Sequence, residues 1–234
     1  MSAFCSAVIV AAGKGKRMKS DIDKQFLKIN GKSILLLTVE KFLKCTFINE
    51  IIIVTSLQHF DDCNKILDSV KSEKSINVVE GGNERCNSVI NGLKACNKKC
   101  EYVFIHDGVR PFVKVSDIAK IYADVKKYDA CVPAVPVKDT IKKINKEGFA
   151  EYTPDRSKLY AVQTPQTFKY SLIVKAYSKL GNNSSVTDDA SVAELAGNKI
   201  FISRGSYENI KITTPEDMYL AKAIYEKEKT DENG

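Results

Sequence analysis

Short apolar runs alternate with longer segments of helical periodicity along most of this chain, and that alternation restricts its fold. The run at 51–54 (Ile-Ile-Ile-Val) is rich in β-branched residues and short enough for a strand that is buried on both faces. Similar runs stand at 7–12, 77–80, 102–105 and 130–135, and helical spacing recurs near 33–44, 59–70, 84–96 and 116–128. Strands that alternate with helices of this length are typical of βαβ units with right-handed crossovers. We therefore expect an α/β, Rossmann-like fold with a mostly parallel twisted sheet flanked by helices.

The alternation stops between residues 138 and 169, where the pattern predicts a β-hairpin. Residues 140–144 and 149–153 flank a polar turn that ends in Gly148, a residue suited to the left-handed conformation. The hairpin has too few apolar residues to be core, so it is either an arm between subunits or a surface flap. We expect one domain over residues 1–234, from which residues 138–156 protrude as a β-arm for dimerisation.

The last part of the chain returns to helical patterns and one strand. Helical spacing is present near 170–180 and 188–196, and a strand-like run at 199–202 leads to an extended stretch at 209–212. Thr214 is suited to cap a final helix and Pro215 to be its first residue. The tail from residue 227 onward is highly charged, and we expect it to be frayed.

Charge, hydropathy and cysteine content argue against several classes of protein. The net charge is +7 over 234 residues, but the basic residues are spread along the chain and lack the interleaved aromatic residues of single-strand nucleic-acid binders. We therefore expect small anionic ligands and no nucleic-acid partner. No apolar run approaches the ~20 residues that span a bilayer, and no signal peptide is evident, so we expect no membrane contact. The seven cysteines are odd in number and irregularly spaced, which is typical of buried free thiols in the reducing cytoplasm.

A glycine-rich basic loop follows the first apolar run, at a place where open α/β sheets bind ligands. Gly13 and Gly15 allow the backbone to approach a ligand closely. Five cations surround that approach: Lys14, Lys16, Arg17, Lys19 and Lys24. The loop matches neither G-x-x-x-x-G-K-[ST] nor, because residue 18 is Met, the dinucleotide G-x-G-x-x-G. We interpret it as a phosphate-binding loop in preference to a solvated basic turn.

Two further polar loops follow strand-like runs and are expected at the same edge of the sheet. One is the stretch 81–85 (Gly-Gly-Asn-Glu-Arg), with Ser88 one turn into the next helix, and the other is 106–111 (His-Asp-Gly-Val-Arg-Pro). Convergence of three such loops is typical of a ligand site. We interpret Asp107 as a ligand or metal contact, and His106 as a buried structural histidine in preference to a catalyst.

Motifs spread from residue 11 to residue 217 resemble one enzyme family. They occur in the order A-A-G-x-G-x-R-M, K-Q, G-G-x-E-R-x-x-S-V, H-D-x-x-R-P, P-V-K-D-T, D-R, Q-T-P-Q, T-D-D-A and N-I-K-I-T-x-P-E-D. The first motif alone marks sugar-nucleotide transferases in general, whereas the combination resembles the 2-C-methyl-D-erythritol 4-phosphate cytidylyltransferases of the non-mevalonate isoprenoid pathway. The departures from the family pattern are Asn83, Val109 and Tyr160.

The resemblance implies an enzyme that transfers CMP from CTP to 2-C-methyl-D-erythritol 4-phosphate, with release of pyrophosphate and formation of 4-diphosphocytidyl-2-C-methyl-D-erythritol. It implies Mg²⁺ held mainly by the CTP phosphates, with Asp107 as a candidate ligand, and a homodimer. The implied transition-state stabilisers are Arg17 and Lys24. The implied nucleotide-binding residues are Ala11, Ala12, Gly13, Gly15, Gly82, Arg85, Ser88, Asp107 and Lys211. The residues implied to position the acceptor substrate are Arg110, Thr140, Arg156, Thr164 and Lys211, and the family places Thr140 and Arg156 on an arm that reaches a neighbouring subunit.

Three alternatives stay open at this point. A ribitol 5-phosphate cytidylyltransferase shares the mechanism, but its loop usually reads Ala-Gly-Gly where this chain has Ala-Ala-Gly at 11–13. A non-catalytic nucleotide-binding regulatory module has no need for cations around the α-phosphate, such as Arg17, Lys24 and Lys211. A nicotinamide-dependent oxidoreductase is disfavoured because the glycine fingerprint fails at residue 18.

Overall fold

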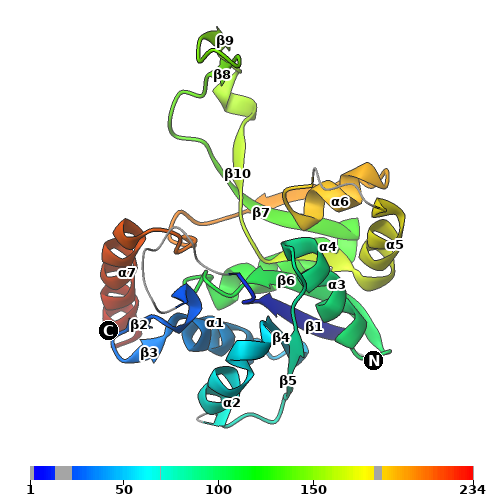
Figure 1. Cartoon of the computed structure of the whole chain (residues 1–234), viewed down its shortest axis with the longest axis vertical. Helices are drawn as coiled ribbons and strands as arrows, with labels where there is room; N and C mark the ends of the chain where they lie inside the picture. Colours follow the sequence, from blue (N-terminus) through cyan, green and yellow to red (C-terminus); the bar gives the residue numbers. More distant parts are fainter. Residues whose placement is uncertain (1–2, 14–22, 69, 182–185, 234) are drawn as a thin grey trace.

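A mixed β-sheet between two layers of helices forms the body of the protein (Figure 1). The computed structural model describes residues 3–13, 23–68, 70–181 and 186–233. The strands of the sheet run in the order β10-β7-β11-β6-β1-β4-β5, and β12 pairs with β7. Their bounds are β1 (Phe4–Val10), β4 (Ile48–Thr55), β5 (Ser75–Glu80), β6 (Cys100–Asp107), β7 (Ala130–Pro136), β10 (Tyr160–Val162), β11 (Gln166–Lys169) and β12 (Phe201–Arg204). The helices are α1 (Ile34–Leu43), α2 (Phe60–Asp68), α3 (Arg85–Ala95), α4 (Val115–Tyr128), α5 (Tyr170–Leu180), α6 (Asp189–Leu195) and α7 (Pro215–Asn233).

The predicted α/β architecture is confirmed, including the parallel half of the sheet. Strands β5, β4, β1 and β6 are parallel neighbours, and β12 is parallel to β7. The chain passes from β1 outward to β4 and β5 and then returns to the other side of β1 with β6. A reversal of this kind is the topological switch point at which open α/β sheets bind ligands. Strands β10 and β11 add antiparallel pairings that the sequence did not predict.

Alternating side chains of the central strands build a separate core on each face of the sheet. Ile51 and Ile53 of β4 belong to one core, which packs against α1 and α4, whereas Ile52 and Val54 belong to the other, which packs against α3, α5 and α6. All four side chains are fully buried. Because successive residues of a strand face opposite sides, a continuous apolar run is what a strand covered on both faces requires.

A glycine on α3 sets how closely this helix lies against the sheet. A Cβ atom at Gly92 would be 2.4 Å from Cγ1 of Val8 on β1, so a larger residue would have to displace the Val8 side chain or the helix. The close approach matters for function because the first turn of α3 carries Arg85 and Ser88 toward the carboxyl ends of the strands.

The predicted hairpin at 138–156 protrudes far from the body (Figure 1). Strands β8 (Lys143–Ile144) and β9 (Ala150–Tyr152) pair antiparallel, and Gly148 has a φ of +90°, as its position in the turn predicts. A short helix, η3 (Arg156–Lys158), follows. Apolar side chains on this arm are exposed, among them Phe149 at 73%.

The expectation of a frayed tail from residue 227 is wrong, because α7 continues to Asn233. Two ion pairs hold this part of the helix to the body: Lys227 lies 2.5 Å from Glu208, and Glu228 lies 2.8 Å from Lys41. The predicted start of the helix is confirmed at Pro215.

The cysteines are free thiols, and all except the half-buried Cys86 are buried, as predicted. In the described ranges, no helix is long and apolar enough to cross a membrane.

Candidate active site

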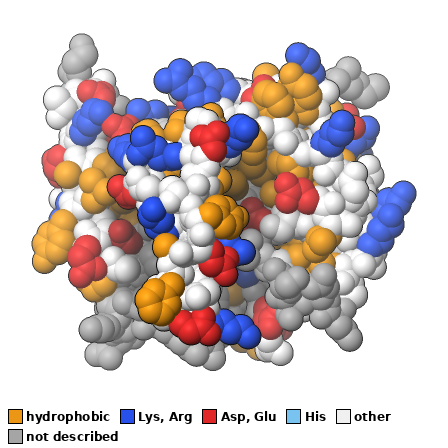
Figure 2. Space-filling model, turned by 90° about the horizontal axis from the view of Figure 1, so that it is seen from above, with side chains coloured by type: hydrophobic (Ala, Val, Ile, Leu, Met, Phe, Trp, Pro, Cys, Tyr) orange, Lys and Arg blue, Asp and Glu red, His pale blue; other side chains and the backbone are white. Residues whose placement is uncertain are grey.

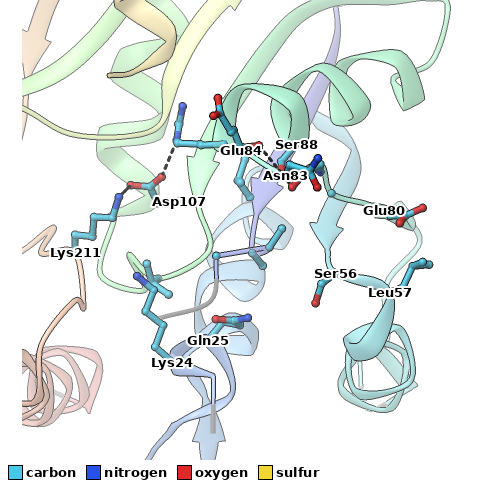
Figure 3. Close-up of a pocket in the computed structure, with 18 residues that line it drawn as sticks. Lys24, Gln25, Ser56, Leu57, Glu80, Asn83, Glu84, Ser88, Asp107 and Lys211 are labelled. Atoms are coloured by element: carbon cyan, nitrogen blue, oxygen red, sulfur yellow. Dashed lines mark hydrogen bonds and ion pairs between the residues drawn. The ribbon is translucent and has the colours of Figure 1, made fainter. Parts of the chain in front are cut away.

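The carboxyl ends of four parallel strands meet at one cavity of about 610 Å³. Its walls come from the ends of β1, β4, β5 and β6 and from the first turn of α3, so the described parts of the three predicted loops do converge, whereas residues 14–22 of the first loop lie outside the described residues. Figure 3 shows Lys24, Asp107 and Lys211 on one side of this cavity and Asn83 and Ser88 on the other. The cavity therefore has a basic end and an opposite end built from the loop that follows β5. Its volume is typical of a site for a small-molecule ligand.

The loop after β5 depends on two glycines. A Cβ atom at Gly81 would stand 2.5 Å from Cβ of Ala12, and one at Gly82 would stand 2.2 Å from Cβ of Asn87. The Gly82 amide donates to the Ser88 hydroxyl at 3.0 Å, which ties this loop to α3. The backbone of this loop is thereby held against the end of β1. Because Gly81 and Gly82 line the cavity and have no side chain, a ligand can approach their peptide groups closely.

Asp107, at the end of β6, is surrounded by three cations. Lys211 Nζ lies 3.0 Å from its Oδ2, Arg110 Nε lies 3.3 Å from the same oxygen, and Arg85 Nε lies 3.6 Å from Oδ1. Burial alone would raise the pKa of this carboxyl, but the three cations outweigh burial and hold the pKa well below its usual range. Asp107 is therefore ionised, and the group as a whole carries a positive charge that suits an anionic ligand.

Buried hydrogen bonds fix the backbone beside Asp107. The Arg110 carbonyl can only accept, so the Nε2–H of His106 donates to it at 3.0 Å. Nδ1 of His106 then accepts from the Thr164 hydroxyl at 2.9 Å, whose oxygen accepts from the Asp107 amide at 3.1 Å. Burial lowers the pKa of His106 to about 4. His106 is a neutral structural residue, as the sequence indicated.

The stretch 209–212 places Lys211 beside Asp107 without joining the described sheet. The Ile212 amide donates to the Val109 carbonyl at 2.9 Å, and the Ile212 side chain is fully buried. Arg110 donates to the Asn209 carbonyl at 2.8 Å. The segment is therefore fastened on both sides of Lys211.

Lys24 reaches the cavity from the short helix η1 (Lys24–Phe26), which His59 holds in place. Asp23 directly precedes η1, and its Oδ2 lies 2.6 Å from Nε2 of His59, while Nδ1 of His59 lies 3.0 Å from Asp62. The ring of His59 also lies against that of Phe26, with centroids 4.7 Å apart. Burial lowers the pKa of His59, but the bonds to the two carboxylates outweigh burial and raise the pKa above its ordinary value.

We expect this histidine contact to stabilise the fold at acidic pH and to weaken as the pH rises. Because the pKa of His59 is higher in the folded protein than in the unfolded chain, its contribution is fully present below about pH 6.5 and is lost above the folded-state pKa. His59→Gln cannot gain a proton, so urea denaturation should show a larger deficit in its free energy of unfolding at acidic than at alkaline pH. A deficit that is the same at both would contradict this assignment.

The structure brings most of the predicted site residues together. Those that line the cavity are Ala11, Ala12, Gly13, Lys24, Gly82, Arg85, Ser88, Asp107 and Lys211. Arg110 and Thr164 do not line it but contact Asp107 from behind. Thr140 and Arg156 lie exposed on the arm, where Arg156 donates to the Lys138 carbonyl at 2.7 Å. Gly15 and Arg17 lie outside the described residues.

Sequence reasoning missed the side chains that hold Arg85. Asp189 is fully buried and accepts from both terminal nitrogens of Arg85, and Tyr177 donates to the same carboxylate. One signal was available in the motif at 187–190: two adjacent acids stand at the start of a helix, and only one of them can cap it. Asp188 is the cap, accepting from the Ser191 amide, which leaves Asp189 to face inward.

The donor set of the cavity suits a metal that a ligand brings with it. Within the described ranges, no group of three or more His, Cys, Asp or Glu side chains could hold a metal ion. Asp107 is ionised, and its Oδ1 has only the longer contact, to Arg85. One carboxylate together with ligand phosphates is a usual way for proteins to bind Mg²⁺.

Comparisons with known proteins identify the family of this chain. The sequence profile described as 2-C-methyl-D-erythritol 4-phosphate cytidylyltransferase matches residues 5–227. A protein of that name from Clostridium botulinum (strain ATCC 19397 / Type A) is 48% identical, covering 95% of this chain and 97% of its own, and one from Clostridium acetobutylicum is 46% identical, covering 94% and 97%. The crystal structure of 4-diphosphocytidyl-2C-methyl-D-erythritol synthase from Anaerococcus prevotii superposes with a TM-score of 0.86 at 35% identity, covering 96% of this chain and 97% of its own. The chain therefore belongs to the 2-C-methyl-D-erythritol 4-phosphate cytidylyltransferase family.

Proposed function

We propose that this protein transfers CMP from CTP to 2-C-methyl-D-erythritol 4-phosphate. A phosphate oxygen of the acceptor attacks the α-phosphorus of CTP, a new P–O bond forms, and the bond to the β-phosphate breaks to release pyrophosphate. The observation that carries the proposal is the polarity of the cavity, with Lys24 and Lys211 at one end and the Gly82–Ser88 loop at the other. That polarity suits a ligand with a compact base and a polyphosphate.

The loop end of the cavity suits the cytosine base, and the basic end suits the phosphates. Peptide groups around Gly82 can hydrogen-bond to a base, while Lys24 and Lys211 oppose the charge of the reacting phosphates. Charge builds up at the α-phosphorus as it gains a fifth oxygen. A cation that is already positioned stabilises that charge without reorganising, and orientation of the two reactants contributes further.

The reaction does not need a general base. A phosphate monoester has a second pKa near 6, so the attacking oxygen is already ionised at neutral pH. This agrees with the state of His106, which is buried and neutral behind the site.

We propose further that Mg²⁺ accompanies CTP, with Asp107 as its protein ligand through Oδ1. When bound, the metal would neutralise charge on the triphosphate oxygens. Arg85, Arg110 and Lys211 keep the Asp107 carboxylate ionised and oriented for that contact.

We also propose that the protein is a homodimer in which the arm of one subunit completes the site of the other. Arg156 and Thr140, which the family resemblance assigns to the acceptor phosphate, lie on the arm and do not line the cavity of their own chain. Apolar side chains exposed on the arm, such as Phe149, Ile144 and Tyr152, are candidates for burial against a partner. Figure 2 shows that hydrophobic and charged side chains are interspersed on the face from which the arm projects.

Labelled CTP tests the proposed transfer directly. With CTP labelled in the α-phosphate, the label should appear in a CDP-alcohol only when methylerythritol phosphate and protein are both present. A non-catalytic nucleotide-binding module would leave all the label in CTP, and that result would contradict the proposal.

We expect Gly82→Ala to weaken CTP binding by overcrowding the base end of the cavity. The new Cβ would stand 2.2 Å from Cβ of Asn87, so the loop must move away from Ser88. A displaced loop loses contacts that it offers to the base, and a loss of about 1.4 kcal/mol in binding corresponds to a KM for CTP about ten-fold higher in steady-state kinetics. Gly181→Ala is the matched control, since its φ of +57° makes a side chain costly there but it does not line the cavity. An unchanged KM in Gly82→Ala would remove this loop from the nucleotide site.

A further inference from the structure

A partly buried ion pair joins α3 to α6 at the edge of the cavity proposed to bind the nucleotide. Nη1 of Arg85 lies 3.0 Å from Oδ1 of Asp189, and Nη2 lies 2.7 Å from Oδ2. Each residue is the first of its helix, and 104 positions separate them in the chain. Asp189 is fully buried, whereas the side chain of Arg85 is 30% exposed, toward the cavity that it lines.

The Asp189 carboxylate accepts three hydrogen bonds from side chains of α3 and α5. Besides the two nitrogens of Arg85, it accepts from the hydroxyl of Tyr177 at 2.6 Å. A two-point contact fixes the plane of a guanidinium, which a single contact does not. Burial works against the charged form of Arg85, but Asp189 outweighs burial and raises the pKa of the guanidinium. Arg85 is therefore held in one orientation from behind.

That orientation determines what Arg85 offers to the cavity. Both terminal nitrogens point at Asp189, so the remaining donor, Nε, lies toward the cavity, 3.6 Å from Oδ1 of Asp107. Asp107 has its other oxygen between Arg110 and Lys211. If the contact to Asp189 were lost, the guanidinium of Arg85 could turn its two terminal nitrogens to Asp107 or into the cavity. The cation contacts around the Asp107 carboxylate would then change.

We propose that Asp189 is a positioning residue for CTP binding, which acts by locking Arg85 against Asp107. This inference rests on the proposed function, because it takes CTP as the ligand of the cavity. Asp189 itself does not line the cavity, so we expect its effect on CTP to pass through Arg85, which does. In metal sites, replacing a group that orients a ligating side chain from behind typically costs about 10- to 100-fold in affinity or activity, and we expect an effect at the lower end of that range here.

The test uses Asp189→Asn, which keeps the shape of the side chain and removes its charge. We expect KM for CTP, and the Kd of CTP measured by calorimetry, to rise about ten-fold, while kcat changes much less. Asp188→Asn is the matched control, since asparagine also caps helices and Asp188 contacts Ser191 and Gln166 instead of Arg85. Its KM for CTP should equal that of the wild type.

Arg85→Gln separates positioning from a merely structural role. In that background Asp189→Asn should raise KM for CTP no further, because the residue through which it acts is gone. An unchanged KM in the single variant, or the same further rise in both backgrounds, would overturn the inference. Should Asp189→Asn not fold, as judged by circular dichroism, Tyr177→Phe removes one bond to the carboxylate. It should raise KM by a smaller factor, and an unchanged KM in that variant would also overturn the inference.

Failure of the proposed function gives a different result. In that case the wild type would not form the CDP-alcohol at all, whereas failure of the inference alone leaves wild-type turnover intact. Calorimetry with CTP measures the role of Asp189 wherever the wild type binds CTP, whether or not it turns the nucleotide over.

Discussion

Replacing Lys24 with alanine should lower kcat by about a hundred-fold or more. Lys24 reaches the basic end of the cavity, where charge develops on the α-phosphate only as the transition state forms. An interaction made only in the transition state affects kcat, whereas one made equally in the ground state affects KM. Steady-state kinetics with CTP varied at saturating acceptor measures the two separately, and KM for CTP should change far less than kcat.

Lys28→Ala is the control for the loss of a lysine from the same segment. Lys28 lies four residues further along on β2 (Lys28–Ile29), is exposed and does not line the cavity. Its kcat should equal that of the wild type. If Lys24→Ala raised KM and left kcat intact, Lys24 would serve uniform binding of the nucleotide, and its assignment as a transition-state stabiliser would be wrong. The sequence makes the same prediction for Arg17, which lies outside the described residues.

Mixing two inactive variants should restore activity if each site is built from two chains. Arg156→Ala lacks the arm residue, and Lys24→Ala lacks the cavity residue. In a two-fold dimer that contains one chain of each, one site has both residues intact and the other has neither. After full exchange of equal amounts, about a quarter of all sites are therefore intact, and the mixture should show up to that fraction of wild-type kcat.

Subunit exchange has to be confirmed first, by capture of one tagged chain through a different tag on the other. Incubation of Arg156→Ala alone and of Lys24→Ala alone under the same conditions sets the baseline. Confirmed exchange with no recovery would mean that Arg156 serves the site of its own chain. The proposal that the arm completes the partner's site would then be wrong.

The central fold could be predicted from sequence because its physical basis is local. The run at 51–54 is apolar at every position, which suits only a segment covered on both faces, and β4 with its two cores bears this out. Strand β11 was missed because its four residues, 166–169, include a single apolar residue, Phe168. Its pairing with β6 and β7 is a long-range arrangement that no local pattern encodes.

The cavity was predictable for the same reason, since each of its loops follows a recognisable strand. The residues that hold the cavity's side chains from behind were not predictable. Asp189 contacts Arg85 across 104 residues, and His59 contacts Asp23 across 36. Nothing near either residue in the sequence reveals its partner, because the helices and loops that bring them together are placed by the packing of the whole sheet.

Release of pyrophosphate from CTP with each of two acceptors tests the proposed reaction most directly. The purified protein with Mg²⁺ should release pyrophosphate with 2-C-methyl-D-erythritol 4-phosphate and far less with ribitol 5-phosphate, and it should release none when CTP is the only substrate. Robust release with ribitol 5-phosphate and none with methylerythritol phosphate would contradict the assignment of the acceptor.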